Sequence, residues 1–440
     1  MAGWSMQGTV FQRHDPGECS PAGRTVPVSR PVSGWPGGAI AAPYHPGAPP
    51  RPLRGILAAV TATAERATPR IGRPRAKARA GAETPVLVRH MRNGIEESVH
   101  RGDIVEADVS GRLIRQLGDP DRLVTLRSTV KPFGVVALIE AGGLEEFDLE
   151  PPELAIMASS HSGEDFHVRT IQGVFRRAGV SQALLACGSE GMPLDALTAA
   201  RLARDGEKAS PIRHMCSGQH AVTLLLSRLK GWDLETYWEP QHPAQAAYRS
   251  AVARAYGTTP DRLRTAIDGC GVETYAFPLR QVAQAYALLA DPGAVPAKDS
   301  RRSLAPALIQ VRDAMLANPE MIGGRHDRLD TSLMKAAEGR VISKAGMEAL
   351  RGMAILPGQR VDSNGTAASG MAVKIEDGDG YDRGTWAASV EALRQAGVLD
   401  GQALRALARY HKPTILDPHG RVGAESIVDF QLAPVGELIG

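Results

Sequence analysis

Ser128 and Lys131 are three residues apart, just before an apolar run at residues 135–139. If this run is helical, the i, i+3 spacing places both side chains on one face of the helix. Serine is a weak nucleophile at its normal pKa, and a neighbouring lysine can remove its proton once the pKa of that lysine has been lowered. The spacing therefore predicts a nucleophile beside its base.

The same spacing occurs twice more, at Ser227 and Lys230 and at Ser332 and Lys335. Ser227 lies inside an apolar run, where Lys230 is typical of a helix end whose amine reaches water. Ser128 follows a polar break and precedes Pro132, which suits a first helical turn. Position therefore favours Ser128 as the match to the Ser-x-x-Lys pattern of enzymes that form acyl intermediates. The alternative is that residues 128–131 are only the solvated start of a helix.

Two further polar segments carry groups of the same chemistry. Residues 159–164, Ser-Ser-His-Ser-Gly-Glu, precede a predicted helix, so they are either functional or a set of helix-capping side chains. Lys344 begins Lys-Ala-Gly after the strand-like residues 341–343, and this resembles the Lys-Thr-Gly element of Ser-x-x-Lys enzymes. A lysine at a strand end is otherwise usually solvated.

Cysteine and histidine recur in two glycine-containing segments, Cys-Ser-Gly-Gln-His at residues 216–220 and Asp-Gly-Cys-Gly-Val at residues 268–272. Cys216 and His220, four residues apart at a helix start, could face one metal ion, and Cys270 could add a second thiolate. A buried, metal-free group of cysteine and histidine side chains is the alternative, and the residues alone do not decide between the two.

The elements that must position these groups fall into three zones. Residues 98–109 and 112–117 predict two strands joined by a tight turn at Ser110 and Gly111. Helical periodicity dominates the middle of the chain, at residues 168–178, 194–205, 220–230, 244–256, 281–290 and 304–317. Strand-like segments return at residues 340–343, 352–356 and 370–375. This order predicts an α+β fold with helices packed on an antiparallel sheet.

Composition narrows the class of protein. The chain has 440 residues, with 43% hydrophobic and 22% charged residues, as expected for a globular protein. Residues 85–440 carry 40 Lys and Arg against 44 Asp and Glu, so no basic nucleic-acid surface is indicated. The longest early apolar run, residues 56–60, is too short for a membrane span and too far from the N-terminus for a secretory signal. Four widely spaced cysteines favour a reducing compartment, and we expect a cytoplasmic protein.

Residues 1–84 differ from the rest of the chain. They hold 12 of the 31 prolines and 11 Lys and Arg against 4 Asp and Glu. Such a segment buries too little apolar surface to offset its ordering entropy. The sequence therefore predicts a disordered extension at residues 1–84 and a catalytic domain at residues 85–440.

Taken together, the motifs resemble those of the bacterial L-asparaginase II family of the thermolabile Rhizobium type. The matching segments occur in family order at residues 127–132, 160–164, 216–220, 268–271, 323–334 and 340–346. The resemblance implies a serine β-lactamase/penicillin-binding-protein-like fold, hydrolysis of L-asparagine to L-aspartate and ammonia, a metal near the cysteine pair, and a homodimer. Gln219 stands where the family commonly has a lysine.

The resemblance also implies roles for particular residues. Ser128 would attack the side-chain amide after Lys131 takes its proton, with Ser160 and Lys344 as further catalytic groups. The pair of Ser160 and Lys344 is the alternative dyad. Substrate-binding residues would be Arg127, Ser162, Gly163 and Glu164. Zinc, not required for the chemical step, would be bound by Cys216, Cys270, His220 and Asp268.

Two other functions remain open at this point. One is a β-lactamase or penicillin-binding-type acyl hydrolase with the same fold, which would not need the cysteine and histidine segments. The other is a catalytically inactive relative that binds an amino acid or a metal. For the asparaginase function, the expected partner is a small-molecule substrate, L-asparagine, with no nucleic acid and no membrane.

Overall fold

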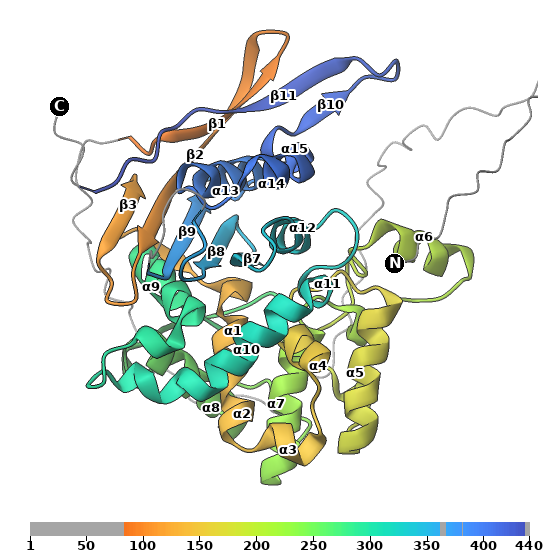
Figure 1. The fold of residues 1–440 in the computed structure, drawn as a ribbon. Helices are drawn as coiled ribbons and strands as arrows, with labels where there is room; N and C mark the ends of the chain where they lie inside the picture. Colours follow the sequence, from red (N-terminus) through yellow and green to blue (C-terminus); the bar gives the residue numbers. More distant parts are fainter. Residues whose placement is uncertain (1–82, 361–366, 381, 436–440) are drawn as a thin grey trace, which may run out of the picture. The chain divides into compact units, whose positions relative to one another are not determined.

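The fold is built around an antiparallel sheet whose strands come from both ends of the described chain (Figure 1). The computed structural model describes residues 83–360, 367–380 and 382–435. The strand order is β10-β11-β1-β2-β9-β8-β7, and β3 also pairs with β2. The strands are β1 (Val86–Arg92), β2 (Ile95–Ala107), β3 (Leu113–Leu117), β7 (Val341–Gly346), β8 (Leu350–Ile355), β9 (Ser369–Ile375), β10 (Thr414–Leu416) and β11 (Val422–Val428).

The predicted strands are confirmed. β2 and β3 form the expected pair, with Ile104 opposite Leu117, although β2 begins three residues earlier than predicted. The three late segments are β7, β8 and β9. A small second sheet of β4 (Leu123–Thr125), β6 (Glu273–Pro278) and β5 (Arg264–Ile267) was not predicted, because its strands are short and all of β5 is exposed.

Helices fill the middle of the chain, as the periodicity predicted. The six expected segments correspond to α5 (Asp165–Ala178), α6 (Ala196–Arg204), α7 (Ser217–Lys230), α8 (Pro243–Ala255), α9 (Leu279–Ala290) and α10 (Ala305–Ala317). The others are α1 (Lys131–Gly134), α2 (Val136–Glu140), α3 (Gly143–Phe147), α4 (Pro151–Met157), α11 (Pro319–Ile322), α12 (Leu329–Ala336), α13 (Arg383–Gln395), α14 (Gly401–Ala406) and α15 (Ala408–His411). The α+β class, an antiparallel sheet flanked by helices, is confirmed.

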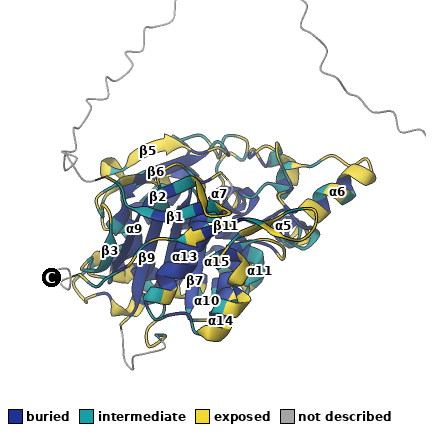
Figure 2. Cartoon of the chain, turned by 90° about the horizontal axis from the view of Figure 1, so that it is seen from above, coloured by how far each residue is buried: buried dark blue, intermediate teal, exposed yellow. Residues whose placement is uncertain are grey.

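Helices cover both faces of the main sheet. On one face α9 packs across β9, β8 and β2, and on the other α13 packs against β9, β11 and β1. Figure 2 shows these helices and the central strands largely buried, whereas β5 and much of α6 are exposed. Two glycines allow the close approach of α9, since a Cβ at Gly352 would clash with Tyr286 and one at Gly370 with the backbone of Ala283. The sheet therefore has a hydrophobic core on each side.

This packing brings the Ser-x-x-Lys segment and Lys344 together. The hydroxyl of Tyr286 in α9 donates a hydrogen bond to the carbonyl oxygen of Thr129 at 2.9 Å, which holds the backbone beside Ser128. Lys344 lies opposite Gly352 in the β7–β8 pair. Because cross-strand partners share a face of the sheet, Lys344 lies on the α9 side, where its side chain is fully buried.

The described part of the chain begins close to the predicted domain boundary. The side chain of Glu83 forms an ion pair with Arg101, and the Thr84 hydroxyl accepts a hydrogen bond from Arg122. The predicted disorder of residues 1–84 falls almost wholly outside the described residues. No helix in the described ranges is long and apolar enough to cross a membrane.

We expect a shortened chain that begins at residue 83 to retain the activity and the thermal midpoint of the full chain. The reason is that residues 1–82 have a composition that cannot form a core of its own. Ammonia release and thermal unfolding of the two chains, measured side by side, check this. A midpoint lowered by more than about 4 °C, roughly 1–2 kcal/mol for a large domain, would show that the extension packs on the fold.

Candidate active site

Ser128 lies in a short 3₁₀ helix, η1 (Arg127–Val130), which runs directly into α1. Its side chain is buried and lines a cavity of about 270 Å³ together with Ser160, Arg328 and Asp382. The preceding residue, Arg127, has a φ of 47°, in the left-handed region that non-glycine residues rarely adopt. Because such strain is concentrated at functional sites, this conformation supports a functional role for the neighbouring serine.

Lys131 is fully buried, and its amine points to a second serine. Its Nζ donates hydrogen bonds to the carbonyl oxygen of Ser159 at 2.8 Å and to Ser160 Oγ at 3.3 Å, and it lies 3.3 Å from Cys216 Sγ. Within the described ranges no hydrogen bond joins it to Ser128 Oγ. The hydrogen bond expected of a dyad is therefore not formed between Ser128 and Lys131, and their shared helix face stays a prediction.

Ser160 lies between the two lysines. Its Oγ accepts a hydrogen bond from Lys344 Nζ at 2.8 Å, so it contacts the amines of both Lys131 and Lys344. Burial lowers the pKa of Lys344 well below its usual value, and the nearby Lys131 acts in the same direction although Asp330 opposes it. A lysine whose pKa is lowered in this way can be neutral and accept a proton. The alternative dyad of Ser160 and Lys344 is therefore formed geometrically.

Asp330 in α12 connects this pair to the sheet. Its carboxylate is buried and accepts hydrogen bonds from Ser343 Oγ at 2.6 Å and from the backbone N–H of Ala345 at 2.9 Å, and it forms an ion pair with Arg351. Burial alone would raise the pKa of Asp330, but the charges of Arg351 and Lys344 outweigh this effect and lower that pKa to about 2. The ionised carboxylate thus holds the end of β7 beside the cavity.

Arg328 supplies a cationic group to the cavity. One guanidinium nitrogen, Nη2, donates a hydrogen bond to the carbonyl oxygen of Ser160 at 2.6 Å. The other, Nη1, is buried and has no hydrogen-bond partner in the described part of the chain. A buried unpaired donor is costly, so this nitrogen is suited to an anionic group of a ligand. Sequence reasoning noted Arg328 only within a family motif and assigned it no role.

The other two Ser-x-x-Lys matches are structural. Ser227 is buried inside α7, where its Oγ donates a hydrogen bond to the carbonyl oxygen of Thr223 at 2.7 Å. Ser332 Oγ contacts the hydroxyl of Tyr410 at 3.0 Å. Neither lines the cavity of Ser128.

Comparison with known families identifies the chain. The family model described as L-asparaginase II matches residues 88–427, which include all the residues above. The chain belongs to the L-asparaginase II family. It is therefore an amidohydrolase, and the expected match between its motifs and this family is confirmed.

Several solved structures show a weak likeness to this member of the L-asparaginase II family. The Bacillus subtilis glutaminase YbgJ, in a covalent complex with 5-oxo-L-norleucine, has 13% sequence identity and a TM-score of 0.33, with 68% of this chain and 89% of that chain covered. A Bacillus glutaminase in 4.3 M NaCl has 11% identity and a TM-score of 0.34, covering 68% and 91%. Mglu in its native form has 16% identity and a TM-score of 0.31, covering 69% and 67%. A search of curated proteins found no match.

The four metal ligands expected from the L-asparaginase II family lie at the start of α7 and in the turn between β5 and β6. Cys216 and Cys270 are both buried, and a hydrogen bond from the Cys270 thiol lowers the pKa of Cys216, with Lys131 acting in the same direction. His220 Nδ1 lies 2.6 Å from the Tyr237 hydroxyl, which leaves the other ring nitrogen of His220 available. Asp268 is the fourth expected ligand, and its Oδ1 accepts a hydrogen bond from Arg127 Nε at 2.6 Å.

Only one group of three or more potential metal ligands is found in the described ranges, and it contains none of these four residues. The predicted set of four ligands stays a prediction. Near the thiol pair in sequence, His220 Nε2 and Gln219 Oε1 are both buried without a hydrogen-bond partner in those ranges. Zinc at the thiol pair likewise stays a prediction.

The residues predicted to bind substrate lie outside the lining of the Ser128 cavity. Arg127 forms an ion pair with Asp268, as described above. Ser162 Oγ donates a hydrogen bond to Glu164 Oε1 at 2.9 Å, and Gly163 has a φ of 80° that only glycine adopts easily. Glu164 is the residue that precedes α5, but its side chain makes no capping hydrogen bond, so the capping interpretation is wrong for this residue.

Proposed function

We propose that this protein hydrolyses the side-chain amide of L-asparagine to L-aspartate and ammonia, with Ser128 as the nucleophile. The observation that carries the proposal is that one cavity is lined by Ser128, Ser160 and Arg328. The buried amines of Lys131 and Lys344 both donate hydrogen bonds to Ser160 Oγ. Membership of the L-asparaginase II family supports the choice of a linear amide as substrate.

The first step is the attack of Ser128 Oγ on the amide carbon of the substrate. Lys131, on the same helix face, takes the hydroxyl proton, and Ser160 Oγ connects it to Lys344. The contact of Ser128 with Lys131 that is absent in the free protein is expected to form when substrate binds, since catalytic hydrogen bonds often tighten only in the complex. The C–N bond then breaks, and ammonia leaves with a proton returned by the lysine pair.

The second step is hydrolysis of the ester between Ser128 and the β-aspartyl group. A water molecule loses a proton to the same lysine pair and attacks the ester carbonyl. The C–O bond to Ser128 breaks, the serine regains its proton, and L-aspartate leaves. Each proton taken in one half of the cycle is returned within it, so no further reactant is required.

The charges around the cavity match a free amino acid. The unpaired Nη1 of Arg328 is suited to the α-carboxylate, because guanidinium and carboxylate form strong charged hydrogen bonds. Asp327 and Asp382, which also line the cavity, can accept the α-ammonium group. A volume of about 270 Å³ is at the small end of ligand pockets, which fits a substrate of this size better than an extended acyl donor.

A second assignment of the nucleophile has an observation in its favour. Ser160 Oγ is 2.8 Å from Lys344 Nζ, whereas no hydrogen bond joins Ser128 Oγ to a lysine in the described part of the chain. Reaction with a diazoketone analogue of asparagine, followed by mass spectrometry of the labelled peptide, separates the two. Label on residue 128 supports the proposal, and label on residue 160 assigns attack to the other pair.

The activity itself is tested by ammonia release. We expect release from L-asparagine, with L-glutamine and a chromogenic cephalosporin measured alongside. Hydrolysis of the cephalosporin alone would assign the protein to β-lactam chemistry. Lack of turnover with all three substrates, despite saturable binding of asparagine in calorimetry, would show an inactive amino-acid-binding relative.

Replacement of Arg328 by lysine tests substrate recognition. We expect KM for asparagine to rise by about 10–100-fold, because a charged hydrogen bond contributes roughly 1.5–3 kcal/mol, with a smaller change in kcat. Arg325→Ala is the matched control, since Arg325 is in the same loop but its guanidinium pairs with Glu320. Unchanged KM in Arg328→Lys, measured by ammonia release, would exclude Arg328 as the carboxylate ligand.

A further inference from the structure

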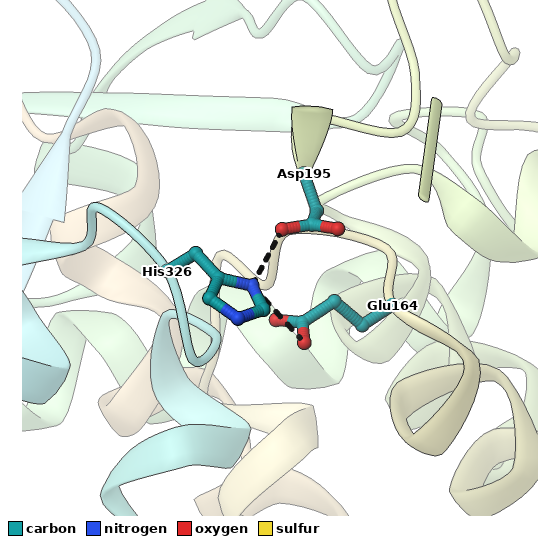
Figure 3. Close-up of side chains that lie close together, drawn as sticks. All are labelled: Glu164, Asp195 and His326. Carbon is teal, nitrogen blue, oxygen red and sulfur yellow. Dashed lines mark hydrogen bonds and ion pairs between the residues drawn. The ribbon is translucent and has the colours of Figure 1, made fainter. Parts of the chain in front are cut away.

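A second group of functional side chains lies outside the Ser128 cavity. Glu164, Asp195 and His326 come from three separate segments, and Figure 3 shows both carboxylates directed at the same ring nitrogen, Nδ1 of His326. Glu164 is only 6% exposed and Asp195 only 5%, whereas His326 is exposed. His326 Nδ1 lies 2.9 Å from Asp195 Oδ1 and 3.8 Å from Glu164 Oε2.

Each carboxylate has one oxygen held by the protein and one directed into the group. Glu164 Oε1 accepts hydrogen bonds from Ser162 Oγ at 2.9 Å and from the backbone N–H of Arg325 at 2.8 Å. Glu164 Oε2 has no hydrogen bond in the described residues, and its one polar contact there is His326. Asp195 Oδ2 accepts two hydrogen bonds from Thr198, both at 2.7 Å, which leaves Oδ1 for His326.

In the described residues no arginine forms an ion pair with Glu164 or Asp195, although the buried charge of Arg328 acts on Glu164 from a greater distance. Arg325 pairs with Glu320, and Arg201 and Arg213 both pair with Asp165. Two buried carboxylates in contact with a single histidine therefore carry excess negative charge. Buried charges of this kind are normally paired or coordinate a metal ion.

We propose that Glu164, Asp195 and His326 bind a divalent transition-metal ion such as Zn²⁺. Their candidate ligand atoms, one from each side chain, all lie within 4.8 Å of one another. With metal–ligand bonds of about 2.0–2.2 Å, tetrahedral ligands lie roughly 3.4 Å apart, so side-chain shifts of about 1 Å would complete the site. Nitrogen and carboxylate oxygen are suitable donors for such an ion, and the remaining positions are left for water.

The ion would join three parts of the fold next to the active site. Glu164 and Asp195 immediately precede α5 and α6, and His326 lies in the loop between α11 and α12. The same loop carries Arg328, whose guanidinium contacts Ser160. Close approach of the loop requires Gly324, because a Cβ there would clash with Ser162 Oγ. Metal binding therefore stabilises the loop that presents Arg328 to the cavity. This inference does not depend on the proposed activity.

Zinc binding to the full-length chain tests the inference. Protein treated with a chelator and then dialysed is titrated with Zn²⁺ by calorimetry, and with Co²⁺ to record the visible spectrum, which differs between thiolate and nitrogen or oxygen ligands. The variants are His326→Ala and Glu164→Gln. The matched control is His419→Ala, an exposed histidine in the turn between β10 and β11. A Cys216→Ser/Cys270→Ser protein separates this site from the thiol pair.

We expect one Zn²⁺ bound at this site in the wild type, in His419→Ala and in the double cysteine variant, with affinity lowered about 100-fold or more in His326→Ala and Glu164→Gln. Saturating Zn²⁺ should raise the thermal midpoint of the double cysteine variant by about 2–4 °C. Three results would each overturn the inference. They are an equal Zn²⁺ affinity in His326→Ala and wild type, a Zn²⁺ dissociation constant above millimolar, and loss of all Zn²⁺ binding in the double cysteine variant.

Discussion

Replacement of Ser128 by alanine is expected to lower kcat for asparagine hydrolysis by about 10⁴-fold or more, because it removes the atom that forms the covalent intermediate. Ser128 is buried at the wall of the cavity, and its Oγ has no hydrogen bond in the described part of the chain, so the substitution should leave the fold intact. Initial rates of ammonia release, together with the thermal midpoint, provide the measurement.

Two serines in the same sequence pattern serve as matched controls. Ser227→Ala and Ser332→Ala remove hydroxyls that bond to Thr223 and Tyr410 within the fold, away from the cavity. Both variants should keep most of the wild-type activity. If Ser128→Ala kept a tenth of the wild-type rate while Ser160→Ala lost it, the nucleophile would be Ser160, activated by Lys344.

The second large loss of activity is expected when either Lys131 or Lys344 is replaced. Lys344→Met and Lys131→Met should each lower kcat/KM by about 10²–10⁴-fold, the range for loss of general acid–base catalysis. Lys344→Arg should be equally impaired, because a guanidinium keeps its proton and cannot act as a base. The effects of Lys131→Met and Ser128→Ala should be strongly non-additive, since the two residues act as one unit.

The pH dependence follows from the direction of the pKa shift. Burial lowers the pKa of Lys344, so its amine is neutral above that lowered value and becomes protonated as the pH falls through it. A protonated Lys344 cannot receive a proton passed from Lys131 through Ser160, so kcat/KM should decrease on the acidic side of the profile. The profile is measured with asparagine at constant ionic strength.

Lys230→Ala is the control for the lysine variants. Lys230 belongs to another Ser-x-x-Lys match, but among the described residues its amine donates its one hydrogen bond to the carbonyl oxygen of Ala141, at the protein surface. Its removal should change neither the rate nor the pH profile. An acidic limb that persisted in any residually active Lys344→Met protein would assign the titration to another group.

Much of the fold was determined locally, and the sequence predicted it for that reason. The six predicted helices have apolar residues at helical spacing, and the turn at Ser110 and Gly111 has the residues that reverse a strand. The i, i+3 spacing of Ser128 and Lys131 likewise depends only on helix geometry. These predictions needed no knowledge of contacts between distant segments. The short exposed strands β4 and β5 were missed because they bury too little apolar surface to give a pattern.

The sequence by itself therefore determined the family, the α+β class and the four catalytic candidates, because these depend on motifs and local periodicity. Only the tertiary structure decided how Ser160 and Lys344, 184 residues apart, come into contact, and that burial lowers the pKa of Lys344. Packing also decided that Arg127 pairs with Asp268, that Arg328 faces the cavity, and that Glu164 joins Asp195 and His326. The direction of a side chain, its partners and its electrostatic environment depend on which segments meet in space, and spacing along the chain does not encode that.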